Sequence, residues 1–171
     1  SIGPEYLTVD VANALFDDEV TRKAVNLSMA VATSKPQGIT AITNARLITM
    51  NDDRQVIDNA TILIENNRIL SVGTDLAIPR DAKIFDARGK TIMPGMIDAH
   101  AHGPYGRGNV IPEQNYNALA HLALGVTTVH NPSSSAAQVF AAAEYQRAGK
   151  VLAPRIFSTG NNVYGAKSVG F

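Results

Sequence analysis

Hydrophobic and polar residues alternate with a period of two along several short segments in the first half of the chain. This alternation is typical of half-buried β-strands. The segments are separated by turn-forming residues, among them Asn66-Asn67, because asparagine tolerates the positive φ of a tight hairpin. The pattern predicts strands at 39–50, 60–65, 68–72 and 83–87. We therefore expect residues 39–90 to form a small antiparallel all-β unit.

The pattern before residue 39 allows more than one interpretation. Alternating runs at 6–11 and 25–31 flank a polar turn at 17–19, which favours two antiparallel strands. A helix over 10–23 is the competing interpretation. Residues 34–38 have the composition of a linker.

After Lys90 the periodicity changes to that of alternating strands and helices. Pro112 is expected in the first turn of the first helix, and Ser134 or Ser135 is expected to cap the second helix. Strands are expected at 91–98, 126–130 and 151–158, and helices at 112–124 and 133–147. A strand–helix–strand–helix–strand series predicts parallel strands with right-handed crossovers.

The sharpest chemical feature is the sequence Asp98-Ala99-His100-Ala101-His102 at the end of the first of these strands. Residues two apart on a strand share a face, so both imidazoles could bind one Zn²⁺ at about 2.0–2.1 Å. Active sites of α/β barrels are built at this carboxyl end of the strands. Two unrelated surface or core histidines are the alternative, because His-x-His is frequent by chance. The position after an apolar strand favours a metal site.

Several ordered segments resemble the amidohydrolase superfamily. They are TNARLIT (43–49), ILIENNRI (62–69) and GKTIMPGMIDAHAH (89–102). Two later segments, GVTTV (125–129) and PRIFSTG (154–160), resemble the imidazolonepropionase-like and prolidase-like members of that superfamily.

The resemblance implies a fold that is α/β plus all-β. Members carry a small β-sandwich, assembled from both chain ends, beside a metal-dependent (β/α)8 TIM-type barrel. By this resemblance, residues 39–90 belong to the β-sandwich and residues 91–171 supply the first strands and helices of an incomplete barrel. Residues 1–38 are a linker or β-strands that resemble the end of an upstream β-propeller.

The resemblance also implies roles for individual residues. His100 and His102 correspond to the first two ligands of a divalent metal, which we expect to be zinc, with one or two ions in the complete enzyme. Asp98 would orient them, although hydrogen bonding at the strand end is the plainer role. The candidate substrate contacts are His130, Tyr105 and Arg107. A structural histidine and a solvated Gly-rich loop at 103–108 are the plainer interpretations of those three.

Composition narrows the function classes further. The chain has 171 residues, 45% of them hydrophobic, which is enough for a core. It has no cysteine, which excludes disulfides, thiolate metal sites and cysteine nucleophiles. Its 15 basic and 15 acidic residues balance, so no charge excess would hold it on nucleic acid or on a membrane surface. No apolar run approaches the roughly 20 residues of a membrane span.

Length decides what this chain could do alone. A (β/α)8 barrel needs about 250 residues, and only 69 residues follow His102, so the chain holds about three of the eight strands. We therefore expect a fragment of an enzyme that hydrolyses C–N bonds of amides, peptides or cyclic amides through a metal-activated water. The chain alone is expected to be inactive, and to form a homo-oligomer or to pair with the missing strands. A non-catalytic binding or assembly domain and a simple metal-binding protein are the alternative functions.

Overall fold

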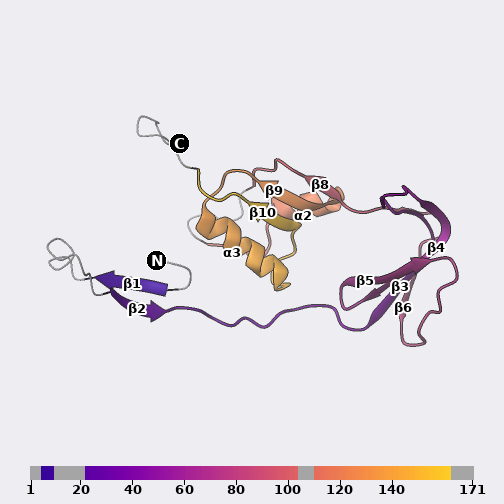
Figure 1. Cartoon of the computed structure of the whole chain (residues 1–171), viewed down its shortest axis with the longest axis horizontal. Coiled ribbons are helices and arrows are strands. Elements are labelled where there is room, and N and C mark those ends of the chain that lie inside the picture. The colour runs from indigo at the N-terminus through magenta and orange to yellow at the C-terminus, as the bar shows by residue number, and fades with distance from the viewer. Residues whose placement is uncertain (1–4, 10–21, 104–109, 163–171) are drawn as a thin grey trace. The chain divides into compact units, whose positions relative to one another are not determined.

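The structure, a computed structural model, describes residues 5–9, 22–103 and 110–162. The chain divides into two compact units, Ser1–Ala32 and Thr33–Phe171. In the first unit, β1 (Glu5–Val9) pairs antiparallel with β2 (Arg22–Asn26), as expected (Figure 1). The second strand lies earlier than the 25–31 run predicted. The competing helix over 10–23 falls mostly outside the described residues, and its last two positions belong to β2.

The second unit contains a five-stranded sheet in which β5, β4, β3 and β6 are neighbours in that order (Figure 1). The fifth strand, β7, also pairs with β3. The strands are β3 (Ile39–Ile48), β4 (Val56–Glu65), β5 (Arg68–Gly73), β6 (Lys83–Asp86) and β7 (Thr91–Ile92). The predicted hairpin is confirmed, because Asn66 and Asn67 have φ values of 47° and 68° and join β4 to β5 in antiparallel register.

The expectation of a wholly antiparallel unit is wrong for the last two strands. Both β6 and β7 run parallel to β3. A parallel neighbour cannot follow through a tight hairpin, because the chain must first return to the other end of the sheet. Residues 74–82 make that return before β6, outside regular strands and helices.

The expectation of a single strand over 91–98 is also wrong, because this segment is divided between two sheets. Thr91–Ile92 pairs with β3, whereas β8 (Met96–Asp98) pairs with β9. Pro94 and Gly95 lie between the two pieces. Proline has no N–H for a ladder hydrogen bond, so the sequence interrupts the strand at this point.

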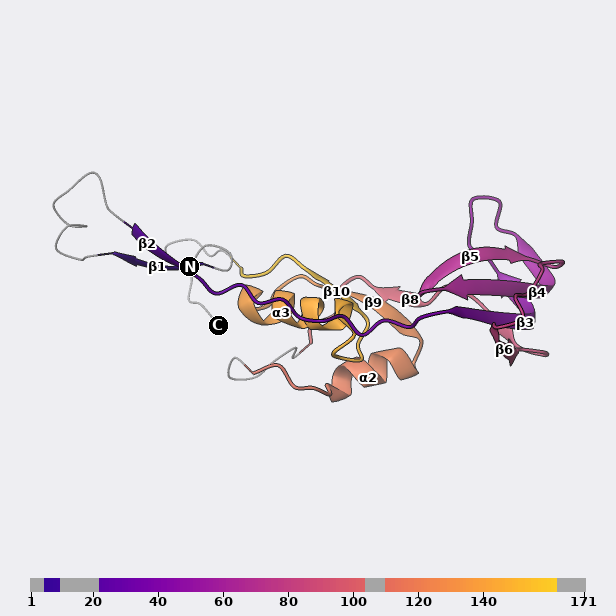
Figure 2. The ribbon, with the colours of Figure 1, turned by 90° about the horizontal axis from the view of Figure 1, so that it is seen from below.

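The second sheet has three parallel strands in the order β10-β9-β8, which confirms the predicted strand–helix alternation (Figure 2). Its elements after β8 are α2 (Tyr116–Ala123), β9 (Val126–Asn131), α3 (Ala136–Arg147) and β10 (Arg155–Ser158).

Both helices begin later than the sequence predicted, although Ser135, one of the two expected caps, is the N-cap residue of α3. Asn115 is the N-cap of α2, and its side chain accepts a hydrogen bond from the Ala118 N–H at 3.1 Å, so Pro112 is not in the first turn. Ser135 is the N-cap of α3 but makes no capping hydrogen bond through its side chain. The first N–H of α3, on Ala136, donates to Asn161 Oδ1 at 2.9 Å. An oxygen from a distant loop therefore replaces the expected serine cap.

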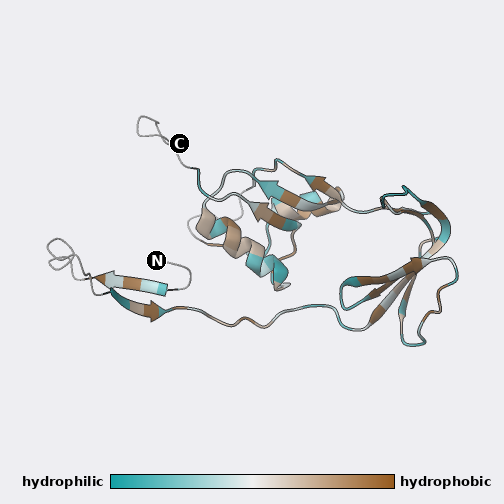
Figure 3. Cartoon of the chain, viewed as in Figure 1, coloured by the Kyte–Doolittle hydropathy of each residue, from teal (hydrophilic) through white to brown (hydrophobic). Residues whose placement is uncertain are grey.

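The core of this part gathers on one face of the three-stranded sheet. Its buried residues include Val129 from β9, Ile156 from β10 and a set of small side chains from the helices, Ala118, Ala142 and Ala143. The C-terminal part of α3 carries most of its hydrophilic residues (Figure 3). Within the described ranges, the structure contains no helix long and apolar enough to cross a membrane.

Gly95 allows β8 to approach β9. A Cβ at this position would overlap the side chain of Thr127 on β9. We predict that Gly95→Ala lowers the free energy of unfolding by about 1–3 kcal/mol, the usual cost of overpacking. Gly73→Ala is the matched control, because its added Cβ would meet only the flexible end of Leu76, at 3.3 Å. Urea unfolding of the three proteins measures the effect, and equal midpoints for both variants would contradict the prediction.

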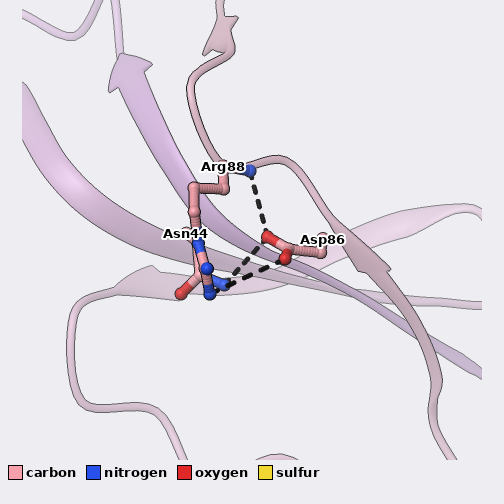
Figure 4. Close-up of polar contacts among 3 residues, drawn as sticks. All are labelled: Asn44, Asp86 and Arg88. Atoms are coloured by element: carbon pink, nitrogen blue, oxygen red, sulfur yellow. Dashed lines mark hydrogen bonds and ion pairs between the residues drawn. The ribbon is translucent and has the colours of Figure 1, made fainter.

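A polar cluster connects β3 to the end of β6. Asn44 Nδ2 donates to Asp86 Oδ1 at 2.9 Å, and the backbone N–H of Arg88 donates to the same oxygen at 3.0 Å (Figure 4). The Arg88 guanidinium lies 3.8 Å from the other carboxylate oxygen. The Asn44 hydrogen bond first, and the Arg88 backbone N–H second, lower the pKa of Asp86 below its ordinary value.

A lowered pKa in the folded state means that the Asp86 charge stabilises the fold above its unfolded pKa of about 3.9. This stabilisation is lost as the pH falls through the lower folded value. We predict that Asp86→Asn destabilises the chain most at neutral pH, and that the difference from wild type shrinks toward acid. Urea unfolding as a function of pH measures the difference. Asn44→Ala should move the pKa of Asp86, followed by NMR, back toward the ordinary value; an unchanged pKa would contradict this.

Candidate metal centre

His100 and His102 follow the carboxyl end of β8, in the turn and loop after the strand. The strand ends at Asp98, so the expectation that both histidines project from a strand is wrong. Their imidazoles nevertheless converge. The two Nε2 atoms lie 3.1 Å apart, and the ring centroids are 4.9 Å apart with the rings inclined by 75°.

Two backbone hydrogen bonds hold the segment that carries these rings. Asp98 Oδ1 accepts from the His100 N–H at 3.0 Å, and the Ala101 N–H donates to the carbonyl of His130 on β9 at 2.9 Å. The side chain of Ala101 is only 6% exposed and belongs to the helix-covered core, while both flanking histidines are exposed. The buried alanine therefore anchors the segment and leaves the imidazoles accessible.

The separation of the two nitrogens fits a shared metal ion. With Zn–N bonds of about 2.0–2.1 Å, two nitrogens 3.1 Å apart subtend about 98° at the metal, close to a tetrahedral angle. Neutral imidazole is also a preferred ligand of zinc. Among residues 5–9, 22–103 and 110–162, however, no three His, Cys, Asp or Glu side chains form a group that could hold a metal. This part of the chain thus offers two ligands, whereas a catalytic zinc takes three from protein.

The loops after β9 and β10, at the same end of the sheet, are joined by hydrogen bonds that sequence reasoning missed. Thr159 N–H donates to the carbonyl of Asn131 at 3.3 Å, and Asn162 Nδ2 donates to Ser133 Oγ at 2.7 Å. The buried side chain of Asn131 accepts from the Ser133 N–H at 3.0 Å. An asparagine at the end of a strand rich in β-branched residues is a local signal for such a turn.

Curated relatives match only part of the chain. No family model matches it. A 5-methylthioadenosine/S-adenosylhomocysteine deaminase from Bacillus thuringiensis (strain Al Hakam) is 34% identical over 65 residues, which cover 37% of this chain and 15% of that protein. The same-named enzyme of Bacillus thuringiensis subsp. konkukian (strain 97-27) is 32% identical over 68 residues, with the same coverage.

Solved structures match a larger part of this chain than the curated relatives do. Molinate hydrolase superposes with a TM-score of 0.62 and 25% identity, covering 78% of this chain and 31% of that one. Phenylurea hydrolase B superposes with a TM-score of 0.59 at 25% identity, and the match covers 74% of this chain and 31% of that one. A Xaa-Pro dipeptidase with bound methionine superposes with a TM-score of 0.57 at 25% identity, and the match covers 74% of this chain and 34% of that one. These structural neighbours are members of the amidohydrolase superfamily, in agreement with the resemblance seen in the sequence.

The matched proteins also share a type of reaction. The related proteins are hydrolases that act on C–N bonds. The chain spans about 15% of the length of the curated relatives it matches, and 31% of the molinate hydrolase chain.

The remaining site residues predicted from the sequence stay predictions. His130 lies near the end of β9, half-buried, beside Phe157 of β10 in the parallel register. Its carbonyl contacts the histidine segment, but the ring does not join a metal-binding group in the part of the chain that the structure describes. Tyr105 and Arg107 lie outside the described residues.

Proposed function

We propose that this chain is the N-terminal part of a metal-dependent amidohydrolase that hydrolyses an amide, peptide or cyclic amide C–N bond. The observation that carries this proposal is the pair of Nε2 atoms 3.1 Å apart, directly after a parallel strand. Sites of α/β barrel enzymes lie at this end of the strands. In an enzyme of a superfamily that acts on C–N bonds, two converging imidazoles are best explained as metal ligands.

In this proposal some residues hold the metal, one orients a ligand and others contact the substrate. His100 and His102 hold a divalent metal, which we propose is zinc, through their Nε2 lone pairs. The chemistry that such an ion supplies when bound is the activation of water for attack on carbon. Asp98 orients the first ligand, and His130, Tyr105 and Arg107 are the proposed substrate contacts.

The finer architecture is part of the same proposal. We assign residues 39–90 to a small β-sandwich and residues 91–171 to the first βα units of a (β/α)8 barrel, with 1–38 as linker or strands of an upstream domain. The parallel order β10-β9-β8, with both helices packed on one face, supports this assignment. The other face would form part of the barrel interior.

The metal site can be tested without any substrate. We predict that the His100→Ala/His102→Ala double variant loses the binding of Zn²⁺ measured by titration calorimetry. His121→Ala is the matched control, because His121 lies on α2 with Nδ1 2.7 Å from the Asn117 carbonyl, and it should bind as wild type does. Undiminished binding by the double variant would remove the basis of the proposal.

The same proteins test whether this chain acts alone. Two ligands leave the coordination of a catalytic zinc incomplete, so we expect no turnover of amide or dipeptide substrates by the 171-residue chain. Turnover above that of the double variant would contradict the expectation.

We also propose that the chain associates with a second copy or with further strands. The sheet face opposite the helices exposes Ile97 at 71% and Phe157 at 55%. Both β8 and β10 are edge strands of their sheet. Exposed edges and apolar faces favour association with another chain.

Analytical ultracentrifugation tests this association. We predict a homo-oligomer at micromolar concentration that shifts toward monomer in Phe157→Ser, because the substitution makes the uncovered face more polar. Tyr116→Ser, at an exposed position at the start of α2, is the matched control and should leave the state unchanged. A monodisperse 18.2 kDa wild-type monomer would contradict the proposal.

A further inference from the structure

We propose that residues 34–38 form a strap, and that the C-terminal end of α3 is the docking site for it. The composition of this segment predicts a linker, yet Ser34 and Gly38, at its two ends, are each hydrogen-bonded to another element of the second unit. This role does not depend on the metal centre. It concerns a segment to which the proposed function gives no task beyond connection.

The end of α3 presents a carbonyl that the strap binds. A helix ends with four carbonyls that have no partner within the helix. The two residues after the C-cap, Gly149 and Lys150, pair two of these carbonyls through backbone bonds of 3.0 and 2.9 Å, in a Schellman motif. The carbonyl of the C-cap residue itself, Ala148, accepts the Ser34 N–H at 2.6 Å. The strap thus supplies a donor that the helix lacks.

A charged side chain from the same end of α3 holds the strap at a second point. Lys150 Nζ donates to Ser34 Oγ at 3.0 Å. A cation is favourable at the C-terminus of a helix, because the helix dipole places negative charge there. Ser34 is therefore bound through both its backbone N–H and its hydroxyl. The docking site accordingly fits an extended segment that carries a hydroxyl side chain at this position.

Gly149 leaves the space in which the strap lies. Its φ of 70° is in the left-handed region, which glycine adopts readily at the end of a helix. A Cβ at this position would also overlap the backbone carbonyl oxygen of Ser34. Gly125 follows α2 with a φ of 85°, but a Cβ there would meet the flexible end of Met96 at 3.4 Å. The helix end thus explains one requirement for glycine at 149, and the strap explains the other.

The other end of the strap is fixed at the start of β3. The Gly38 N–H donates to Asn66 Oδ1 at 3.1 Å, and the Asn66 N–H donates to the Gly38 carbonyl at 3.1 Å. Asn66 lies in the turn between β4 and β5, so the strap joins the end of α3 to this turn. Between the two ends, Pro36 has a fixed φ and biases Lys35 toward extended conformations, which lowers the entropy lost on docking.

The strap lies on the surface, since all of residues 34–38 are exposed. A few hydrogen bonds in contact with water must therefore balance the entropy lost when the segment is ordered. Segments held in this way open locally, without unfolding of the sheets beneath them. We therefore expect a single steric block at the docking site to release the strap.

The experiment is amide hydrogen exchange of the 171-residue chain, followed by NMR at Ser34. The Ser34 amide should be protected in wild type, because its N–H is bonded to the end of α3. We expect Gly149→Ala to lower its protection factor by about 10-fold, the effect of losing about one hydrogen bond. Gly125→Ala is the matched control, because it places alanine at the same left-handed position after a helix without touching the strap. Unchanged exchange of the β9 amides shows that the sheet itself remains folded.

A second pair of variants keeps the test decisive if Gly149→Ala does not fold. Lys150→Met keeps most of the aliphatic side chain and removes the donor to Ser34 Oγ, so the protection factor of the Ser34 amide should fall by about 2–5-fold. Lys35→Met is the matched control. It makes the same substitution within the strap, away from this contact, and should leave the protection unchanged.

The outcomes decide the role of the strap without reference to metal binding. Loss of protection at Ser34 in Gly149→Ala or Lys150→Met, with wild-type protection in the matched control, supports the docking site. A Ser34 amide that is unprotected in wild type would overturn it. Equal protection at Ser34 in Gly149→Ala and Gly125→Ala would also overturn it, as would equal protection in Lys150→Met and Lys35→Met where the glycine variant does not fold.

Discussion

The parallel pairing of β8 with β9 is the contact on which the candidate site depends. It requires β8 to lie against Thr127, which only a residue without a side chain permits at position 95. The pairing continues past the strand, because the Ala101 N–H bonds to the His130 carbonyl. A short strand of three residues thereby carries the histidine segment to a defined place at the edge of the sheet.

The three-stranded sheet that this pairing builds has one face covered by helices and one exposed face. Small alanines of α2 and α3 cover one face and bury Val129 and Ile156. The other face exposes Ile97 and Phe157, a distribution expected of an element that packs against further structure. The matched relatives are longer than this chain, so the proposed barrel would explain both the exposed face and the presence of only two candidate ligands among the described residues.

The five-stranded sheet shows how similar local patterns can lead to different pairings. Alternation along β4 and β5, with Asn66-Asn67 between them, led to the expected hairpin because that pairing is local. The strands β6 and β7 show similar short β-rich patterns but pair with the distant β3 in parallel. Nothing in their own residues distinguishes the two outcomes, since direction depends on the path of residues 74–82 and 87–90 rather than on periodicity.

What the sequence determined by itself was therefore local. The existence of most strands and of both helices, the hairpin turn, and the closeness of the His100 and His102 rings could be predicted from spacing and residue type, because these depend on neighbours along the chain. Only the tertiary structure decided which sheet each half of 91–98 joins and which distant residue caps α3. It also decided that Asp98 bonds to a backbone amide. These outcomes depend on groups that come together from different strands and loops. They also depend on backbone N–H donors, which every residue except proline carries, so no pattern of side chains along the chain could predict these contacts.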